Sequence, residues 1–119
     1  MKKLFLIIFS VLLTMSFTLN ETYGKASWYG HPYHGRKAAS GEIYNMNSLT
    51  AAHRTLKFGT KLKVTNIANN KSVVVRINDR GPFVKGKILD LSKAAFQQIA
   101  SSSVGVINIK YNVIWRKHG

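Results

Sequence analysis

Residues 61–78 read KLKVTNIANNKSVVVRIN, and this stretch indicates the class of fold. In 61–65, charged or polar residues alternate with apolar ones, which is the two-residue period of a half-buried strand. Residues 71–78 are a β-branched run that places Val73, Val75 and Ile77 on one face. The residues between the two runs include two asparagines, and Asn tolerates the left-handed backbone of tight turns. The stretch therefore predicts a β-hairpin with one buried face.

Outside this hairpin the sequence predicts further strands and one helix. Residues 25–29 and 106–114 have the composition of strands. Ser92 is a good helix N-cap, and Gly105 is a favoured residue beyond a helix end. The apolar face of this helix repeats every four residues, at Leu91, Ala95 and Ile99. Several short strands with a single helix predict a mainly β protein, arranged as a small closed barrel.

The first 24 residues are predicted not to belong to the barrel. Two lysines follow Met1, and residues 4–19 are almost wholly apolar. A basic start before a short apolar run is typical of a secretory signal peptide, and a membrane-spanning helix needs about 20 apolar residues. We therefore predict a signal peptide over 1–24, with an uncleaved N-terminal anchor as the alternative, and one domain over 25–115. Export from the cytoplasm follows from this assignment.

Charge and cysteine content narrow the chemistry. The 119-residue chain has 18 Lys and Arg against 4 Asp and Glu, a formal net charge of +14, and no cysteine. Without cysteine there is no disulfide, thiolate metal site, cysteine nucleophile or cysteine-linked lipid anchor. A strongly basic protein attracts polyanions, which outside the cytoplasm include cell-wall polymers. The sequence contains no nucleic-acid-binding motif, so nucleic acid is not an expected partner.

Carboxylate chemistry within 25–119 must use Glu42, Asp79 or Asp90. Glu42 follows a glycine among apolar and hydroxyl neighbours. If solvent is restricted around it, its pKa would be raised, which suits a general acid. If it lies on the surface, it would instead pair with a nearby cation. Asp79 begins a rigid turn, where it is expected to accept turn amides or pair with an arginine. Asp90 precedes the predicted helix, where it could stabilise the helix N-terminus or project into a cleft.

Histidines and aromatic residues supply the other candidates. His53 follows three small or hydroxylated residues that would hold its imidazole in place, although a lone histidine is more often structural. His31 and His34 lie three apart without a third partner, so neither a metal site nor a cofactor is expected. Trp28 is expected in the core, and Tyr29 is equally suited to the core or to stacking on a sugar ring.

Several short motifs occur together in one order: ASWYG at 26–30, HGR at 34–36, ASGE at 39–42, TAAH at 50–53, NDRGPF at 78–83 and DLS at 90–92. In this combination the chain resembles the rare lipoprotein A family, the septal-ring lytic transglycosylases, over roughly 25–114. The resemblance implies a six-stranded double-psi β-barrel, related to expansins, with one short helix. It also implies a location in the periplasm or cell envelope and endolytic cleavage of peptidoglycan glycan strands there. The strands cleaved would preferentially be those lacking stem peptides, and the products would have 1,6-anhydromuramic acid ends.

Carried over residue by residue, the resemblance implies that Glu42, His53 and Asp90 are catalytic. Glu42 is the favoured acid, Asp90 the second and Asp79 a distant third, while His53 would orient the carboxyl or polarise the sugar. The expected substrate contacts are Tyr29, Tyr44, Asn45 and Asp79. Asn45 stands where many members of the family carry aspartate, so a second acidic group near Glu42 is missing.

The resemblance also bears on partners. We expect a monomer that acts on glycan strands, with division-site proteins as candidate partners. No glycan-binding repeat domain follows Ile114, so septal targeting by that route is not expected. The alternative function is a non-catalytic, expansin-like module that binds the cell wall.

Overall fold

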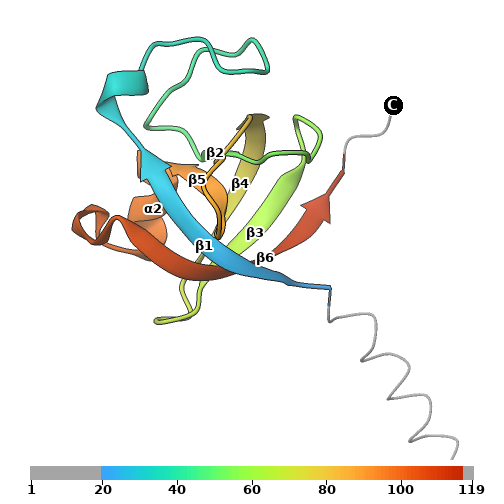
Figure 1. The fold of residues 1–119 in the computed structure, drawn as a ribbon, viewed down its shortest axis with the longest axis vertical. Helices are drawn as coiled ribbons and strands as arrows, with labels where there is room; N and C mark the ends of the chain where they lie inside the picture. Colours follow the sequence, from blue (N-terminus) through green and yellow to red (C-terminus); the bar gives the residue numbers. More distant parts are fainter. Residues whose placement is uncertain (1–19, 117–119) are drawn as a thin grey trace, which may run out of the picture.

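Six strands close into a barrel in the computed structural model, which describes residues 20–116. Most of the predicted signal peptide lies outside these residues. Figure 1 shows the barrel with a single α-helix against one side. The strands are β1 (Thr22–Tyr29), β2 (Thr50–Ala52), β3 (Lys61–Asn66), β4 (Ser72–Asp79), β5 (Lys87–Ser92) and β6 (Val106–Trp115). The helix is α2 (Lys93–Ile99), and two short 3₁₀ turns are η1 (His31–Tyr33) and η2 (Ser102–Val104).

The order of strands around the barrel is β1-β5-β2-β4-β3-β6, closing back on β1. The pairs β1–β5 and β2–β4 are parallel, and the other pairs are antiparallel. A closed barrel leaves no long free edge, so a small β-protein avoids edge-to-edge association. This architecture confirms the predicted six-stranded barrel with one short helix. Within residues 20–116, no helix has the length and apolar character needed to cross a membrane.

The predicted hairpin is formed by β3 and β4. Leu62 pairs with Val75 and Val64 with Val73, and all four side chains are buried. Asn70 in the connecting turn has a φ of 61°, the left-handed conformation for which asparagine is suited. The two-residue period of this stretch therefore correctly predicts which side chains point into the barrel and which point outward.

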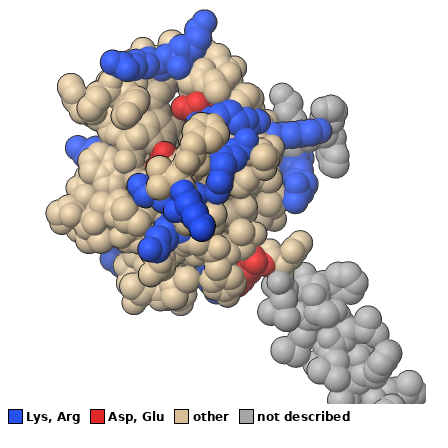
Figure 2. Space-filling model, in the orientation of Figure 1, with Lys and Arg blue, Asp and Glu red and all other residues tan. Residues whose placement is uncertain are grey.

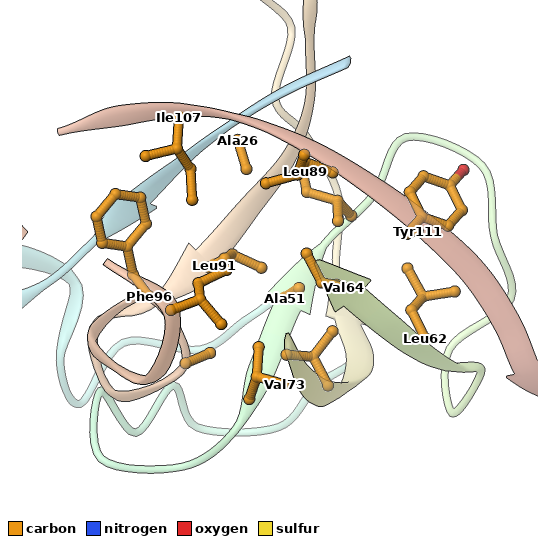
Figure 3. Close-up of a cluster of buried hydrophobic side chains, with 14 of the residues drawn as sticks. Ala26, Ala51, Leu62, Val64, Val73, Leu89, Leu91, Phe96, Ile107 and Tyr111 are labelled. Carbon is orange, nitrogen blue, oxygen red and sulfur yellow. The ribbon is translucent and has the colours of Figure 1, made fainter. Parts of the chain in front are cut away.

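The core fills the barrel interior and continues beneath α2. Figure 3 shows side chains from several strands and from the helix meeting in one cluster. Leu62, Ile77, Leu89, Leu91 and Ile109 are fully buried, and Phe96 of α2 covers one end of the cluster. Trp28 packs against this core as expected, and its indole Nε1–H donates to the carbonyl of Ser102 over 3.1 Å.

Two predicted boundaries differ from the structure. Strand β1 begins at Thr22 rather than Lys25, because residues 22–24 pair with Tyr111, Lys110 and Ile109 of β6. The predicted start of the domain at residue 25 therefore falls inside a strand.

Helix α2 ends at Ile99 instead of continuing to Val104. The serines that follow favour local hydrogen bonds over a helix, and the hydroxyl of Ser101 accepts from the backbone N–H of Ser103 at the start of η2. Gly105, with φ of 80°, thus ends η2 and not the helix.

Candidate active site

Two aspartates flank the short strand β2 at one end of the barrel. Ala52 of β2 pairs with Asp90 of β5 on one side and with Asp79 of β4 on the other. With strands about 4.8 Å apart, the two aspartate Cα atoms are separated by about 10 Å. A cleft of about 250 Å³ lies at this position. Its lining consists of Tyr29, Tyr33, Arg36, Lys37, Ala38, Tyr44, Ala52, Asp79, Arg80 and Asp90.

The Asp90 carboxylate is oriented by a single side-chain hydrogen bond. The hydroxyl of Ser27, its register partner on β1, donates to Asp90 Oδ1 over 2.5 Å. Among residues 20–116 this is the one hydrogen bond made by the Asp90 carboxylate. Oδ2 is therefore left for a ligand in the cleft, while Ser27 fixes the orientation of the group.

Asp79 is more fully engaged. Its Oδ1 accepts the backbone N–H of Arg80 over 2.8 Å and that of Ala39 over 2.9 Å. The first bond confirms the expectation that Asp79 accepts a turn amide. The second bond fastens the loop around Ala39, whose neighbour Ala38 lines the cleft, to the end of β4.

Two stacked tyrosines form one wall of the cleft. The rings of Tyr29 and Tyr44 lie 4.4 Å apart at 25°, and the buried Tyr44 hydroxyl donates to the carbonyl of Tyr29 over 2.5 Å. The Tyr29 hydroxyl is buried and has no hydrogen-bond partner among the described residues. Burial raises the pKa of Tyr29, and the negative charges of Asp79 and Asp90 add to this effect. Tyr29 is therefore a neutral donor beside both aspartates.

Three cations line the same cleft as the aspartates: Arg36, Lys37 and Arg80. Arg80 is locked in place, because its Nη1 donates to the carbonyls of His53 and Leu56 over 3.1 and 2.8 Å, and its guanidinium lies 3.9 Å from the Phe58 ring centroid. Sequence reasoning did not single out these three residues or Ser27 as functional. The HGR and DRG motifs contain the two arginines, but only the fold shows that they share a cleft.

Glu42 lies outside the cleft lining. Its carboxylate accepts two hydrogen bonds from Arg76 of β4, at 2.6 and 2.7 Å, on an exposed part of the surface. These bonds from Arg76 are the main reason why the pKa of Glu42 lies below its ordinary value of 4.5. Burial opposes the shift, and the Arg76 charge and Asn78 assist it. The raised pKa expected of a general acid is therefore not found, and Glu42 is ionised at neutral pH.

The Glu42–Arg76 pair nevertheless acts on the cleft through the backbone. The N–H of Ala38 donates to the carbonyl of Glu42, and Lys37 pairs with Ile43, so residues 37–43 form a small hairpin. Gly41 closes its turn with φ of 92°, a conformation that favours glycine. Lys37 and Ala38 on one arm line the cleft, so the ion pair fixes part of its wall.

His53 and Asn45 also lie beside the cleft rather than in its lining. His53 Nδ1 accepts the backbone N–H groups of Thr55 and Leu56, so Nε2 carries the proton and faces the Tyr111 hydroxyl at 3.1 Å. Burial lowers the pKa of His53, and the charges of Arg54 and Arg80 lower it further. The imidazole is thus neutral and committed to its own loop.

Asn45 has a local role, since its Oδ1 accepts the backbone N–H of Asn47. Of the seven residues proposed from the sequence, the cleft brings together Tyr29, Tyr44, Asp79 and Asp90. Glu42, His53 and Asn45 are not part of its lining. In residues 20–116 no three His, Asp or Glu side chains gather as metal ligands.

The barrel is shared with solved proteins of distant sequence. A Streptomyces papain inhibitor matches 82% of this chain and 96% of its own at a TM-score of 0.67, with 22% sequence identity. An expansin from Clavibacter michiganensis matches 83% of this chain and 52% of its own at a TM-score of 0.64, with 24% identity. These similarities define an expansin-like, double-psi type of β-barrel.

Sequence comparison is more specific. The family described as lytic transglycolase matches residues 21–111, and the chain belongs to this family. A probable endolytic peptidoglycan transglycosylase RlpA of Synechocystis is 57% identical over 91 residues, which are 76% of this chain and 28% of the relative. The endolytic peptidoglycan transglycosylase RlpA of Campylobacter jejuni is 55% identical over 91 residues, 76% of this chain and 33% of the relative. The chain thus spans about a third of the length of these curated relatives.

Proposed function

We propose that this chain is an endolytic peptidoglycan transglycosylase of the cell envelope, with Asp90 as its acid and base. Membership of the lytic transglycolase family supports the reaction class. The observation that carries the assignment of the acid is the position of Asp90, which lines the cleft, is oriented by Ser27 and keeps one carboxylate oxygen unpaired among the described residues.

The reaction needs one group that gives a proton and then takes one back. Asp90, in its carboxylic acid form, protonates the glycosidic oxygen that leaves muramic acid. The bond from the anomeric carbon to that oxygen breaks through an oxocarbenium-like transition state. The 6-hydroxyl of the same sugar attacks the anomeric carbon and passes its proton to the Asp90 carboxylate. The product has a 1,6-anhydro end, no water is consumed, and Asp90 is again protonated.

The remaining cleft residues suit a carboxylated sugar strand. Arg36, Lys37 and Arg80 would pair with the carboxylate of muramic acid, and the Tyr29 hydroxyl would donate to a sugar oxygen. The fixed negative charge of Asp79 would stabilise the oxocarbenium-like sugar. Tyr44, Glu42 and His53 would act as positioning residues, through the Tyr29 backbone, the 37–43 hairpin and the loop after β2 respectively.

The test uses the full chain, purified, with peptide-free glycan strands and mass spectrometry of the 1,6-anhydro ends. We expect the unsubstituted chain to generate these ends and Asp90→Asn to lose at least about a hundredfold in rate, as expected for loss of a general acid. Glu42→Gln is the matched carboxyl-to-amide comparison outside the cleft, and we expect it to lose much less, on the order of tenfold, because Glu42 acts only through the 37–43 hairpin. Strands that are bound but never cleaved by the unsubstituted chain would instead support a wall-binding module of the expansin kind.

A further inference from the structure

One outer face of the barrel is basic, and none of its side chains lines the cleft. It consists of Lys61 and Lys63 of β3, Val74 and Arg76 of β4, and Trp115 of β6, and we call it the basic face. The registers Lys61–Arg76, Lys63–Val74 and Lys61–Trp115 place these side chains next to one another, and the inward positions between them are buried. Figure 2 shows Lys and Arg side chains gathered over the part of the molecule where β3 and the end of β6 lie in Figure 1.

The positive charges on the basic face are not arranged in a way that stabilises the fold. Lys61 and Arg76 are opposite each other across two strands, and like charges so placed destabilise a sheet. Arg76 is compensated by Glu42. Lys61 and Lys63 have no carboxylate partner among residues 20–116, where the other salt bridge joins Lys110 to Glu21. Two lysines about 7 Å apart along one strand thus project as uncompensated charge.

A bulge in β6 adds an aromatic ring to this charge. Leu62 pairs with Val113 but Lys61 pairs with Trp115, so Ile114 is an extra residue in the ladder. Bulges re-aim side chains, and this one turns the Trp115 ring beside Lys61, whose Nζ lies 5.9 Å from the ring centroid. The ring remains half exposed, and Val74 on the same face is 44% exposed. Cations beside an open aromatic ring suit an anionic sugar polymer, whose carboxylates pair with the lysines and whose sugar faces stack on the indole.

The basic face is also linked to the cleft. Arg76 holds Glu42 at the tip of the 37–43 hairpin, and Lys37 and Ala38 of that hairpin line the cleft. We propose that the basic face is a second, non-catalytic binding surface for carboxylated glycan strands, engaging a strand whose other part occupies the cleft. The choice of this polyanion over others rests on the proposed function. Short fragments would fill the cleft alone, whereas long strands would reach both surfaces and gain affinity from the second.

The experiment measures equilibrium binding of fluorescent, peptide-free glycan strands to the full chain carrying Asp90→Asn, which is expected to keep the strands intact. The double variant Lys61→Gln/Lys63→Gln is compared with Lys71→Gln/Lys85→Gln, which removes the same charge from exposed turns. We expect long-strand binding to weaken about tenfold in the first variant and less than about twofold in the control. Trp115→Leu, which keeps an apolar group but removes the ring, should weaken it about fivefold at unchanged charge.

Short and uncharged sugars distinguish a specific glycan-binding surface from a general effect of net charge. Disaccharide-length fragments should bind all variants equally, and uncharged chitin oligosaccharides should not respond to the lysine changes. Equal weakening in the lysine variant and its control would overturn the proposal, because net charge would then explain the binding. A lysine effect confined to single-stranded DNA, with glycan binding unchanged, would overturn it in favour of nucleic acid. Cleavage is scored separately as anhydro ends with Asp90 intact, so a binding surface without activity would count against the proposed function alone.

Discussion

Breaking the ion pair between Glu42 and Arg76 distinguishes two roles for Glu42. The carboxylate is bound by both guanidinium nitrogens at 2.6 and 2.7 Å, on side chains that are 43% and 39% exposed. A pair this exposed contributes about 0.5 to 1 kcal/mol to the free energy of unfolding. For a domain of this size that corresponds to a loss of about 2 to 8 °C in Tm. We expect Glu42→Gln, Arg76→Gln and the double variant to show similar losses in thermal unfolding, because each removes the same pair.

The same variants have a distinct kinetic signature. If Glu42 acts by holding the 37–43 hairpin through Arg76, both single variants should lose a similar factor in the rate of anhydro-end formation, on the order of tenfold. The double variant should be no slower than either single variant, since residues that act as a unit are not additive. If Glu42 is instead the acid, Glu42→Gln should lose about a hundredfold to ten-thousandfold while Arg76→Gln keeps most activity. That second pattern would refute the structural reasoning.

The pH dependence of stability gives an independent readout. The pKa of Glu42 is lower in the folded chain than its ordinary value of 4.5, mainly because of the hydrogen bonds from Arg76. The unfolded chain therefore takes up the proton first as pH falls. The contribution of the pair is complete above pH 4.5 and disappears as pH falls through the folded pKa. In urea titrations, Glu42→Gln should differ from the unsubstituted chain at neutral pH and converge with it in acid.

Three other predictions concern stability. Tyr44→Phe should cost about 1 to 2 kcal/mol in chemical unfolding, because the Tyr29 carbonyl loses its donor in a buried site; an unchanged midpoint would contradict the 2.5 Å bond. Burial and the charges of Arg54 and Arg80 lower the pKa of His53 below its ordinary value of 6.5, so the free energy of unfolding should fall as pH drops below 6.5. In urea titrations, His53→Gln should make this fall with pH less steep. A chain that begins at Lys25 should have a Tm several degrees lower than one that begins at residue 20, because three residue pairs between β1 and β6 are lost. Equal Tm values would contradict this and would support a domain that starts at residue 25.

The parts of the fold that local sequence predicts are those whose partners lie nearby. The β3–β4 hairpin follows from alternation and an asparagine turn, and Ser92 does cap α2, accepting from the N–H of Ala95. The extent of β1 could not be predicted in this way. Residues 22–24 become strand only because β6, at the far end of the chain, pairs with them. The short strand β2 likewise depends on β4 and β5 on either side.

In the candidate site, too, some residues could be predicted from local sequence and others depend on distant contacts. Asp79 and Asp90 could be selected because the segment from 25 onward has few acids, and both line the cleft. The environment of Glu42 could not be predicted, since Arg76 lies 34 residues away and reaches it only after the barrel closes. Ser27 was visible in a motif, but its bond to Asp90 follows from a parallel pairing of β1 with β5 that no local pattern encodes.

The central claim is tested most directly by mass spectrometry of 1,6-anhydromuramic ends released from peptide-free strands by the unsubstituted chain and by Asp90→Asn. The account predicts abundant anhydro ends from the first and a rate lower by about a hundredfold or more from the second, with the fold of the variant intact by circular dichroism. Anhydro ends produced by Asp90→Asn at the unsubstituted rate would contradict the assignment of Asp90 as the acid. Their absence from the unsubstituted chain would contradict the proposed activity itself.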